Sequence, residues 1–170
     1  MSKEIQQKKK TLITKLFNEH PEIREAKKFT GIIVLAWFLT RVFAVATEYY
    51  CVLQGVLPFS IANIAALLVM ALFVWTIYQG IRTLAYLPIL GSVIMIIQTF
   101  TEQLYSLLSA QYILSVRIYA AAFIVTAYAQ LFLMLFLLSN EKSTMYFDAM
   151  KKIAAQLGLA DNSVNRHDRR

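Results

Sequence analysis

Four long apolar stretches dominate the sequence. They cover roughly residues 29–53, 59–80, 82–103 and 116–139. An α-helix rises about 1.5 Å per residue, so about 20 apolar residues cross the hydrocarbon core of a bilayer. Each stretch is long enough for one crossing. The pattern therefore predicts an all-α fold, an integral membrane four-helix bundle.

The overall composition favours the same class of protein. Hydrophobic residues make up 58% of the chain and charged residues 16%, whereas soluble domains carry about 45–50% and about 25%. Cys51 is the one cysteine, so neither an internal disulfide nor a paired-thiol redox site can form. The composition indicates a membrane protein.

Basic residues set the expected orientation in the membrane. Residues 1–29 hold eight Lys or Arg and residues 140–170 hold six, while 49–58 and 104–115 hold none. The positive-inside rule then predicts a multi-pass protein of the cell membrane with both termini in the cytoplasm. The expected partner of this charge is the anionic headgroups of the bilayer. Nucleic acid is not expected, because no platform of aromatic and basic residues accompanies the charge.

The N-terminal end is predicted to form a separate short helix. Residues 1–20 mix apolar and basic side chains, which indicates a cytoplasmic amphipathic helix. This helix should end at His20, because the residue before a proline is disfavoured in a helix. Pro21 suits the first turn of the next helix. We therefore expect a new helix at Pro21, opening a four-span domain over residues 21–139.

The C-terminal end, residues 140–170, is predicted to form a second cytoplasmic amphipathic helix followed by a disordered tail. Its apolar residues recur at three-to-four spacing: Met145, Ala149, Met150, Ile153, Ala154 and Leu157. The favoured interpretation is a helix on the inner leaflet, and the alternative is docking to a cytoplasmic partner. Residues 104–115 have two interpretations as well: they extend the third helix or lie along the outer membrane surface.

Two charges lie within the first apolar stretch. Arg41 is expected near the bilayer centre and Glu48 near its outer edge. A charge at the centre costs at least about 2.5–3.5 kcal/mol on insertion scales. The two residues share one helix face but lie about 10 Å apart along the axis. A direct ion pair between them is therefore not expected.

Polar residues of the other stretches are the candidate partners of Arg41. The predicted ligand-binding or packing centre comprises Arg41, Glu48, Gln98, Glu102, Gln130 and Asn63. In one interpretation, Arg41 pairs with Glu48, Gln98, Glu102 or Gln130 and fixes how the helices pack. In the other, Arg41 is the floor of an outward-facing polar cavity suited to an anionic ligand. The sequence leaves both open.

Catalytic patterns are not found in the apolar part of the chain. His20 and His167 lie in the polar ends, and no cluster of residues has metal-ligand spacing. Neither a nucleophile–histidine arrangement nor a glycine-rich phosphate loop is present. We therefore expect no enzymatic activity, no metal and no cofactor.

Two functions are favoured by these features, and a third class, an intramembrane enzyme, has the least support. The first is a non-enzymatic membrane protein that acts through helix–helix contacts, as an accessory, immunity or regulatory subunit of a membrane complex. Its expected partner is another membrane protein or a second copy of the chain. The alternative is a small transporter or channel protomer that uses a polar cavity floored by Arg41.

Overall fold

The computed structural model describes residues 3–58, 61–108 and 113–158. All regular structure in these ranges is helical. Three segments are long and apolar enough to cross a membrane: Pro21–Leu53, Arg82–Thr101 and Leu114–Ser139. The prediction of an all-helical chain is therefore confirmed for the described residues, three of whose helices have the length and composition of membrane spans. The tail predicted to be disordered lies, from residue 159 onward, outside the described residues.

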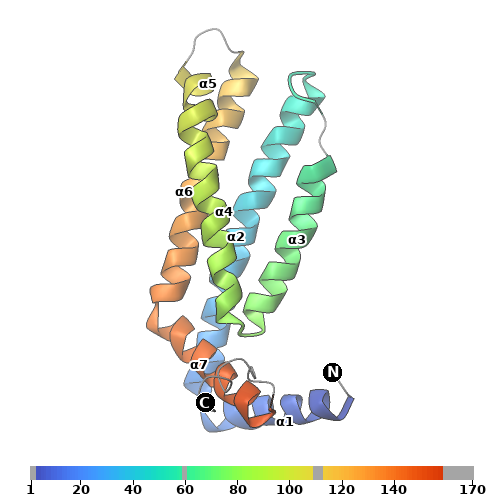
Figure 1. Ribbon diagram of the computed structural model, residues 1–170, viewed down its shortest axis with the longest axis vertical. Helices are drawn as coiled ribbons and strands as arrows, with labels where there is room; N and C mark the ends of the chain where they lie inside the picture. Colours follow the sequence, from blue (N-terminus) through green and yellow to red (C-terminus); the bar gives the residue numbers. More distant parts are fainter. Residues whose placement is uncertain (1–2, 59–60, 109–112, 159–170) are drawn as a thin grey trace, which may run out of the picture.

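Four helices run alongside one another (Figure 1). They are α2 (Pro21–Leu53), α3 (Ile61–Tyr78), α4 (Tyr86–Gln98) and α6 (Leu114–Ser139). α2 packs most extensively on α6, α3 packs on α2, and α4 packs on α6. The described apolar part of α3, Ile64–Tyr78, is shorter than the other three. A fourth membrane crossing by α3 thus stays a prediction.

The third apolar stretch is not one uniform helix. A short 3₁₀ turn, η1 (Arg82–Ala85), precedes α4, and a π-helical turn, η2 (Thr99–Gln103), joins α4 to α5 (Leu104–Leu108). Pro88 falls in the first turn of α4, where a proline is tolerated. Residues 104–108 therefore extend the third helix, as one of the two interpretations held, and residues 109–112 lie outside the described ranges.

The first and last described helices, α1 and α7, lie at the same end of the other helices (Figure 1). α1 (Lys3–Glu19) ends one residue before His20, and α2 begins at Pro21. The predicted break is therefore at the expected place. α7 (Glu141–Gln156) begins after Asn140, whose side chain accepts a hydrogen bond of 3.0 Å from the backbone N–H of Lys142. Such a cap satisfies one of the free N–H groups at a helix start.

The apolar face of α7 packs on the chain itself. Its buried residues include Tyr146, Phe147, Met150 and Ile153. They share a core cluster with Ile23 and other residues at the base of α2, and with partly buried residues of α1. Lys151 and Lys152, by contrast, are exposed. The face expected to meet lipid or a separate partner is therefore occupied, in this structure, by α1 and α2.

The turn between α3 and α4 is held to α7 and α6. The Tyr146 hydroxyl donates a hydrogen bond of 2.6 Å to the carbonyl oxygen of Tyr78. Gly80 has a φ of +92° and lies against the side chain of Met150. The Arg82 Nη2 donates to the carbonyl oxygen of Leu138, at 3.1 Å, near the end of α6. Carbonyls in the last helical turn lack helical partners, so this contact satisfies one of them.

Candidate functional site: a polar cavity among four helices

One face of α2 lines a cavity in the middle of the helices. Trp37, Arg41, Ala44, Val45 and Glu48 all border it. These residues follow the three-to-four spacing that places side chains on one face of a helix. The cavity volume is about 520 Å³, which is within the range of small-molecule sites in proteins, about 300–1,000 Å³.

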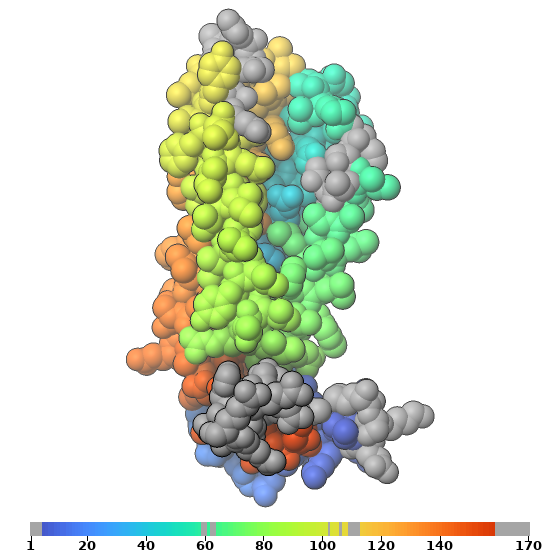
Figure 2. Space-filling view, viewed as in Figure 1, coloured from blue at the N-terminus to red at the C-terminus, as the bar shows by residue number. Residues whose placement is uncertain are grey.

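The other walls come from α3, α4 and α6. α3 and α4 supply apolar side chains, α4 adds Ser92 and Gln98, and α6 supplies Tyr119, Phe123 and Gln130. α3 and α4 make little direct contact beyond their connecting turn. Figure 2 shows a hollow between them, with α2 visible at its floor. The cavity therefore opens sideways, between α3 and α4.

Three buried nitrogen atoms of the lining residues have no hydrogen-bond partner among the described residues: Trp37 Nε1, Arg41 Nε and Gln130 Nε2. The side chains of Trp37 and Gln130 are 1% exposed. Indole and guanidinium N–H groups only donate hydrogen bonds. An unsatisfied buried donor costs about 1–3 kcal/mol. Three residues that line the cavity therefore carry buried N–H groups that lack an acceptor among the described residues.

Among the described residues, the charge of Arg41 is only weakly compensated. Its Nη1 approaches the Met95 sulfur at 3.9 Å, and a thioether is a weak acceptor. Between described side chains, the ion pairs are Lys15–Glu19 and His20–Glu22, so no described carboxylate pairs with Arg41. A half-buried cation in this position favours a negatively charged or strongly polar partner.

The hydroxyls of Ser92, in α4, and of Thr99, the first residue of η2, are satisfied by backbone carbonyls of α4. The Ser92 hydroxyl donates to the Pro88 carbonyl at 2.8 Å, and the Thr99 hydroxyl donates to the Met95 carbonyl at 3.0 Å. Such back-bonding is common for serine and threonine inside helices. The unsatisfied donors of the cavity are thus concentrated on α2 and α6.

The structure brings four of the six predicted site residues together. Arg41, Glu48, Gln98 and Gln130 line the same cavity. Glu48 is half-buried and has an interaction of its own. The side chains of Glu102 and Asn63 lie outside the described residues. The hydrogen bond that the structure gives Arg41 goes to Met95, a residue that sequence reasoning did not consider.

Trp37 is a second residue that the sequence analysis missed. It lies one helical turn before Arg41, so its position on the same face follows from helical periodicity. The signal was present in the spacing, but a tryptophan in an apolar stretch is ordinarily a packing residue. Only the unpartnered indole N–H in the structure distinguishes it.

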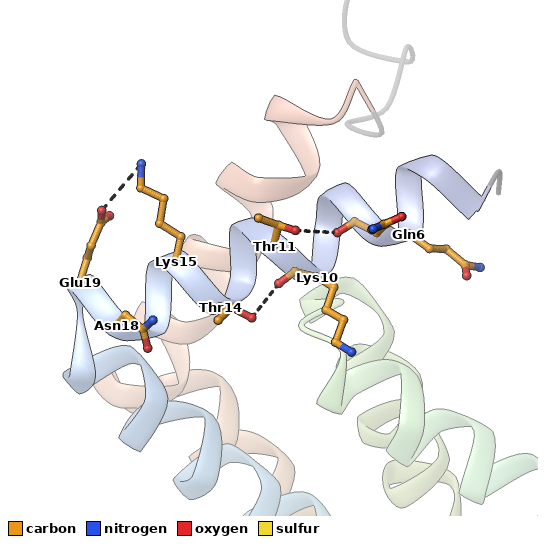
Figure 3. A pocket seen from close by; sticks show the side chains of 8 residues that line it. Gln6, Lys10, Thr11, Thr14, Lys15, Asn18 and Glu19 are labelled. Atoms are coloured by element: carbon orange, nitrogen blue, oxygen red, sulfur yellow. Dashed lines mark hydrogen bonds and ion pairs between the residues drawn. The ribbon is translucent and has the colours of Figure 1, made fainter.

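A hollow beside α1 has a different character. Figure 3 shows that its labelled side chains, Gln6 to Glu19, all project from this one helix. Lys15 and Glu19 form an ion pair of 3.8 Å, and the Thr11 and Thr14 hydroxyls donate to backbone carbonyls one turn earlier. These four side chains therefore find partners along the helix itself, and all residues that line the hollow belong to α1. Among the described residues, no group of three His, Cys, Asp or Glu can hold a metal ion.

Comparisons of the chain with protein-family models, with curated proteins and with solved structures gave no match. The function is therefore argued from the cavity itself.

Proposed function

We propose that the chain is a non-enzymatic, multi-pass membrane protein that binds a small ligand in the cavity between α2, α3, α4 and α6. It would act as a small transporter or channel protomer. α3 then forms the fourth crossing, and both termini lie in the cytoplasm, where the basic residues of the two ends meet anionic headgroups. α1 and α7 form the cytoplasmic end of the protein.

The observation that carries this proposal is the set of unpartnered donors on Trp37, Arg41 and Gln130. A packing residue in a membrane protein is expected to find its partner on a neighbouring helix, because hydrocarbon offers none. No acceptor for these three donors is found among the described residues, which favours an acceptor from outside the protein. A ligand or bound water in the cavity would supply it.

A second candidate function follows from the sideways opening between α3 and α4. A transmembrane helix of another membrane protein, or of a second copy, would fit against the opening and place a polar side chain beside Arg41. The chain would then be an accessory, immunity or regulatory subunit that acts through helix–helix contacts.

Native mass spectrometry of protein purified in a mild detergent tests both candidates. We expect the wild-type protein to carry a small molecule at up to one copy per chain, and Arg41→Gln to lose it. Arg117→Gln is the matched control, because Arg117 is exposed and donates to the Leu107 carbonyl away from the cavity. A stoichiometric second protein whose loss follows Arg41→Gln would favour the accessory role instead. If the wild-type protein carries neither a small molecule nor a second protein, the proposed function is wrong.

A further inference from the structure

We infer that the ligand is a single-chain anionic amphiphile. Its acidic headgroup meets Arg41, Trp37 and Gln130, and its alkyl chain extends through the opening between α3 and α4. This inference rests on the proposed ligand-binding function and adds the chemical class of the ligand and its route of entry.

The headgroup is specified by the donors. Trp37 Nε1 and Arg41 Nε are N–H groups without an acceptor among the described residues, and Arg41 carries a positive charge. A carboxylate or phosphate offers several acceptor oxygens and a negative charge, and both form charge-assisted hydrogen bonds with guanidinium. A neutral alcohol would satisfy one donor and leave the charge of Arg41 unpaired. These donors therefore favour an acidic oxygen group at the Arg41 end of the cavity.

The apolar residues of α3 and α4 at the cavity opening are the evidence for an alkyl chain. Val69, Met70 and Phe73 of α3 face Leu87 and Gly91 of α4 across the opening. Val69, Leu87 and Gly91 are exposed at its rim. These side chains offer apolar contact and no charge, so they suit hydrocarbon rather than a hydrated ion.

The route of entry follows from the surface around the opening. The outward faces of α3 and α4 carry exposed apolar side chains, among them Leu68, Leu72, Leu90 and Ile94. In a spanning helix such side chains contact lipid tails. An amphiphile can therefore pass from the bilayer into the cavity without crossing water. At about 520 Å³, the cavity is in the lower half of the usual range for ligand sites, which suits a headgroup with one chain rather than two.

Binding of defined amphiphiles to the full chain in neutral-lipid nanodiscs tests this inference. The probes are laurate and dodecyl phosphate, with dodecanol and dodecyltrimethylammonium as neutral and cationic controls of equal chain length. Acetate and inorganic phosphate carry the same headgroups without the chain. Trp37 fluorescence in a Trp75→Phe background reports occupancy, because Trp37 lines the cavity whereas Trp75 is 63% exposed. Native mass spectrometry reads the same complexes independently.

We expect the two anionic amphiphiles to bind at one site and to quench or shift Trp37. Arg41→Gln should weaken their binding roughly ten- to a hundred-fold, the equivalent of a lost charged hydrogen bond. Trp37→Phe, read by mass spectrometry, should weaken it by roughly three- to ten-fold. Arg117→Gln should leave the affinity unchanged.

Three outcomes would overturn the inference. If dodecanol or the cationic amphiphile binds as tightly as laurate and dodecyl phosphate, the site does not require an acidic headgroup. Equal affinity for acetate or inorganic phosphate would show that the ligand is a water-borne anion. Anionic amphiphiles that fail to bind, while the purified protein retains another small molecule dependent on Arg41, would reject this ligand class and leave the proposed ligand-binding function standing.

Discussion

The hydroxyl of Tyr146 lies 2.6 Å from the carbonyl oxygen of Tyr78, to which it donates a hydrogen bond. Tyr78 is the last residue of α3, and Tyr146 lies on the buried face of α7. The bond therefore joins α7 to the end of α3, the helix that forms one side of the cavity opening. It satisfies a carbonyl that the helix itself leaves without a partner.

Replacing Tyr146 by phenylalanine removes this bond and keeps the ring. We expect Tyr146→Phe to lower the free energy of unfolding by about 0.5–1.5 kcal/mol, the usual net value of one hydrogen bond. Thermal unfolding of the detergent-solubilised protein measures the change. Tyr86→Phe, which alters an exposed tyrosine of α4, is the control and should have no effect. Equal stability of wild type and Tyr146→Phe would show that the bond contributes nothing.

Alkaline pH should weaken the same contact. Burial, and to a lesser degree the nearby Tyr78, raises the pKa of Tyr146 above its ordinary value. The folded state therefore keeps the phenol protonated after it would ionise in the unfolded chain, at about pH 10. The contribution of protonated Tyr146 to the free energy of unfolding is fully present below that pH. It is lost as pH rises toward the pKa of Tyr146 in the folded state. Unfolding measured between pH 8 and 11 should show this loss in wild type and a smaller loss in Tyr146→Phe.

Gly80 should not tolerate a side chain. A Cβ at this position would lie 2.5 Å from the Cβ and Cγ of Met150, and the φ of +92° is strained for other residues. We expect Gly80→Ala to lose about 1–2 kcal/mol from the left-handed backbone and a further 1–3 kcal/mol, roughly, from overpacking. Gly55→Ala is the matched control, since Gly55 has a φ of +69° with nothing near its Cβ. Similar losses of stability in both variants would show that the Met150 side chain moves to accommodate the added methyl group at little cost.

Arg41 should be dispensable for folding. No described carboxylate pairs with Arg41. The Arg41→Leu substitution therefore removes the desolvation cost of a half-buried charge and breaks no described ion pair. The melting temperature of the ligand-free protein should stay the same or rise. Arg82→Leu is the matched control, because Arg82 donates to the Leu138 carbonyl, and its melting temperature should fall. A fall of several degrees for Arg41→Leu would instead support the packing interpretation of Arg41.

The orientation of the chain can be tested with engineered thiols. Cys51 is buried, and its thiol donates to the Ser115 carbonyl at 3.2 Å, so it should not react with an impermeant reagent. In a Cys51→Ala background, Gln54→Cys should be labelled on intact cells, because Gln54 is exposed beyond the end of α2. Lys152→Cys should be labelled only after the membrane is opened. The reverse pattern would place both termini outside.

The helices were predictable because their signals are local. Apolar stretches, the His20–Pro21 break and the spacing of apolar residues in 145–157 each depend on neighbours in sequence. The π-helical turn at Thr99–Gln103 carries no comparable signal. The docking of α7 was not predictable either, since an amphipathic face looks the same whether it meets lipid, a partner or the base of α2.

The site was predictable in part for a similar reason. Intramembrane polar residues are few, so Arg41, Glu48, Gln98 and Gln130 could be singled out, and helical periodicity put Arg41 and Glu48 on one face. Their convergence with Trp37 depends on how α6 packs against α2 and α4 packs against α6, which is long-range information. The proximity of Arg41 to the Met95 sulfur reflects such packing and had no sequence signal.

The donors of the cavity come from α2 and α6, the first and last of the four helices in the chain. During synthesis, α2 leaves the ribosome long before Gln130 has been made. Arg41 must therefore enter the membrane before the helix that completes its surroundings exists. A chain interrupted before α6 would carry an incomplete cavity and an exposed intramembrane cation. At the bilayer centre such a charge costs at least about 2.5–3.5 kcal/mol on insertion scales, so the unfinished chain would be held in the membrane less favourably than the finished one.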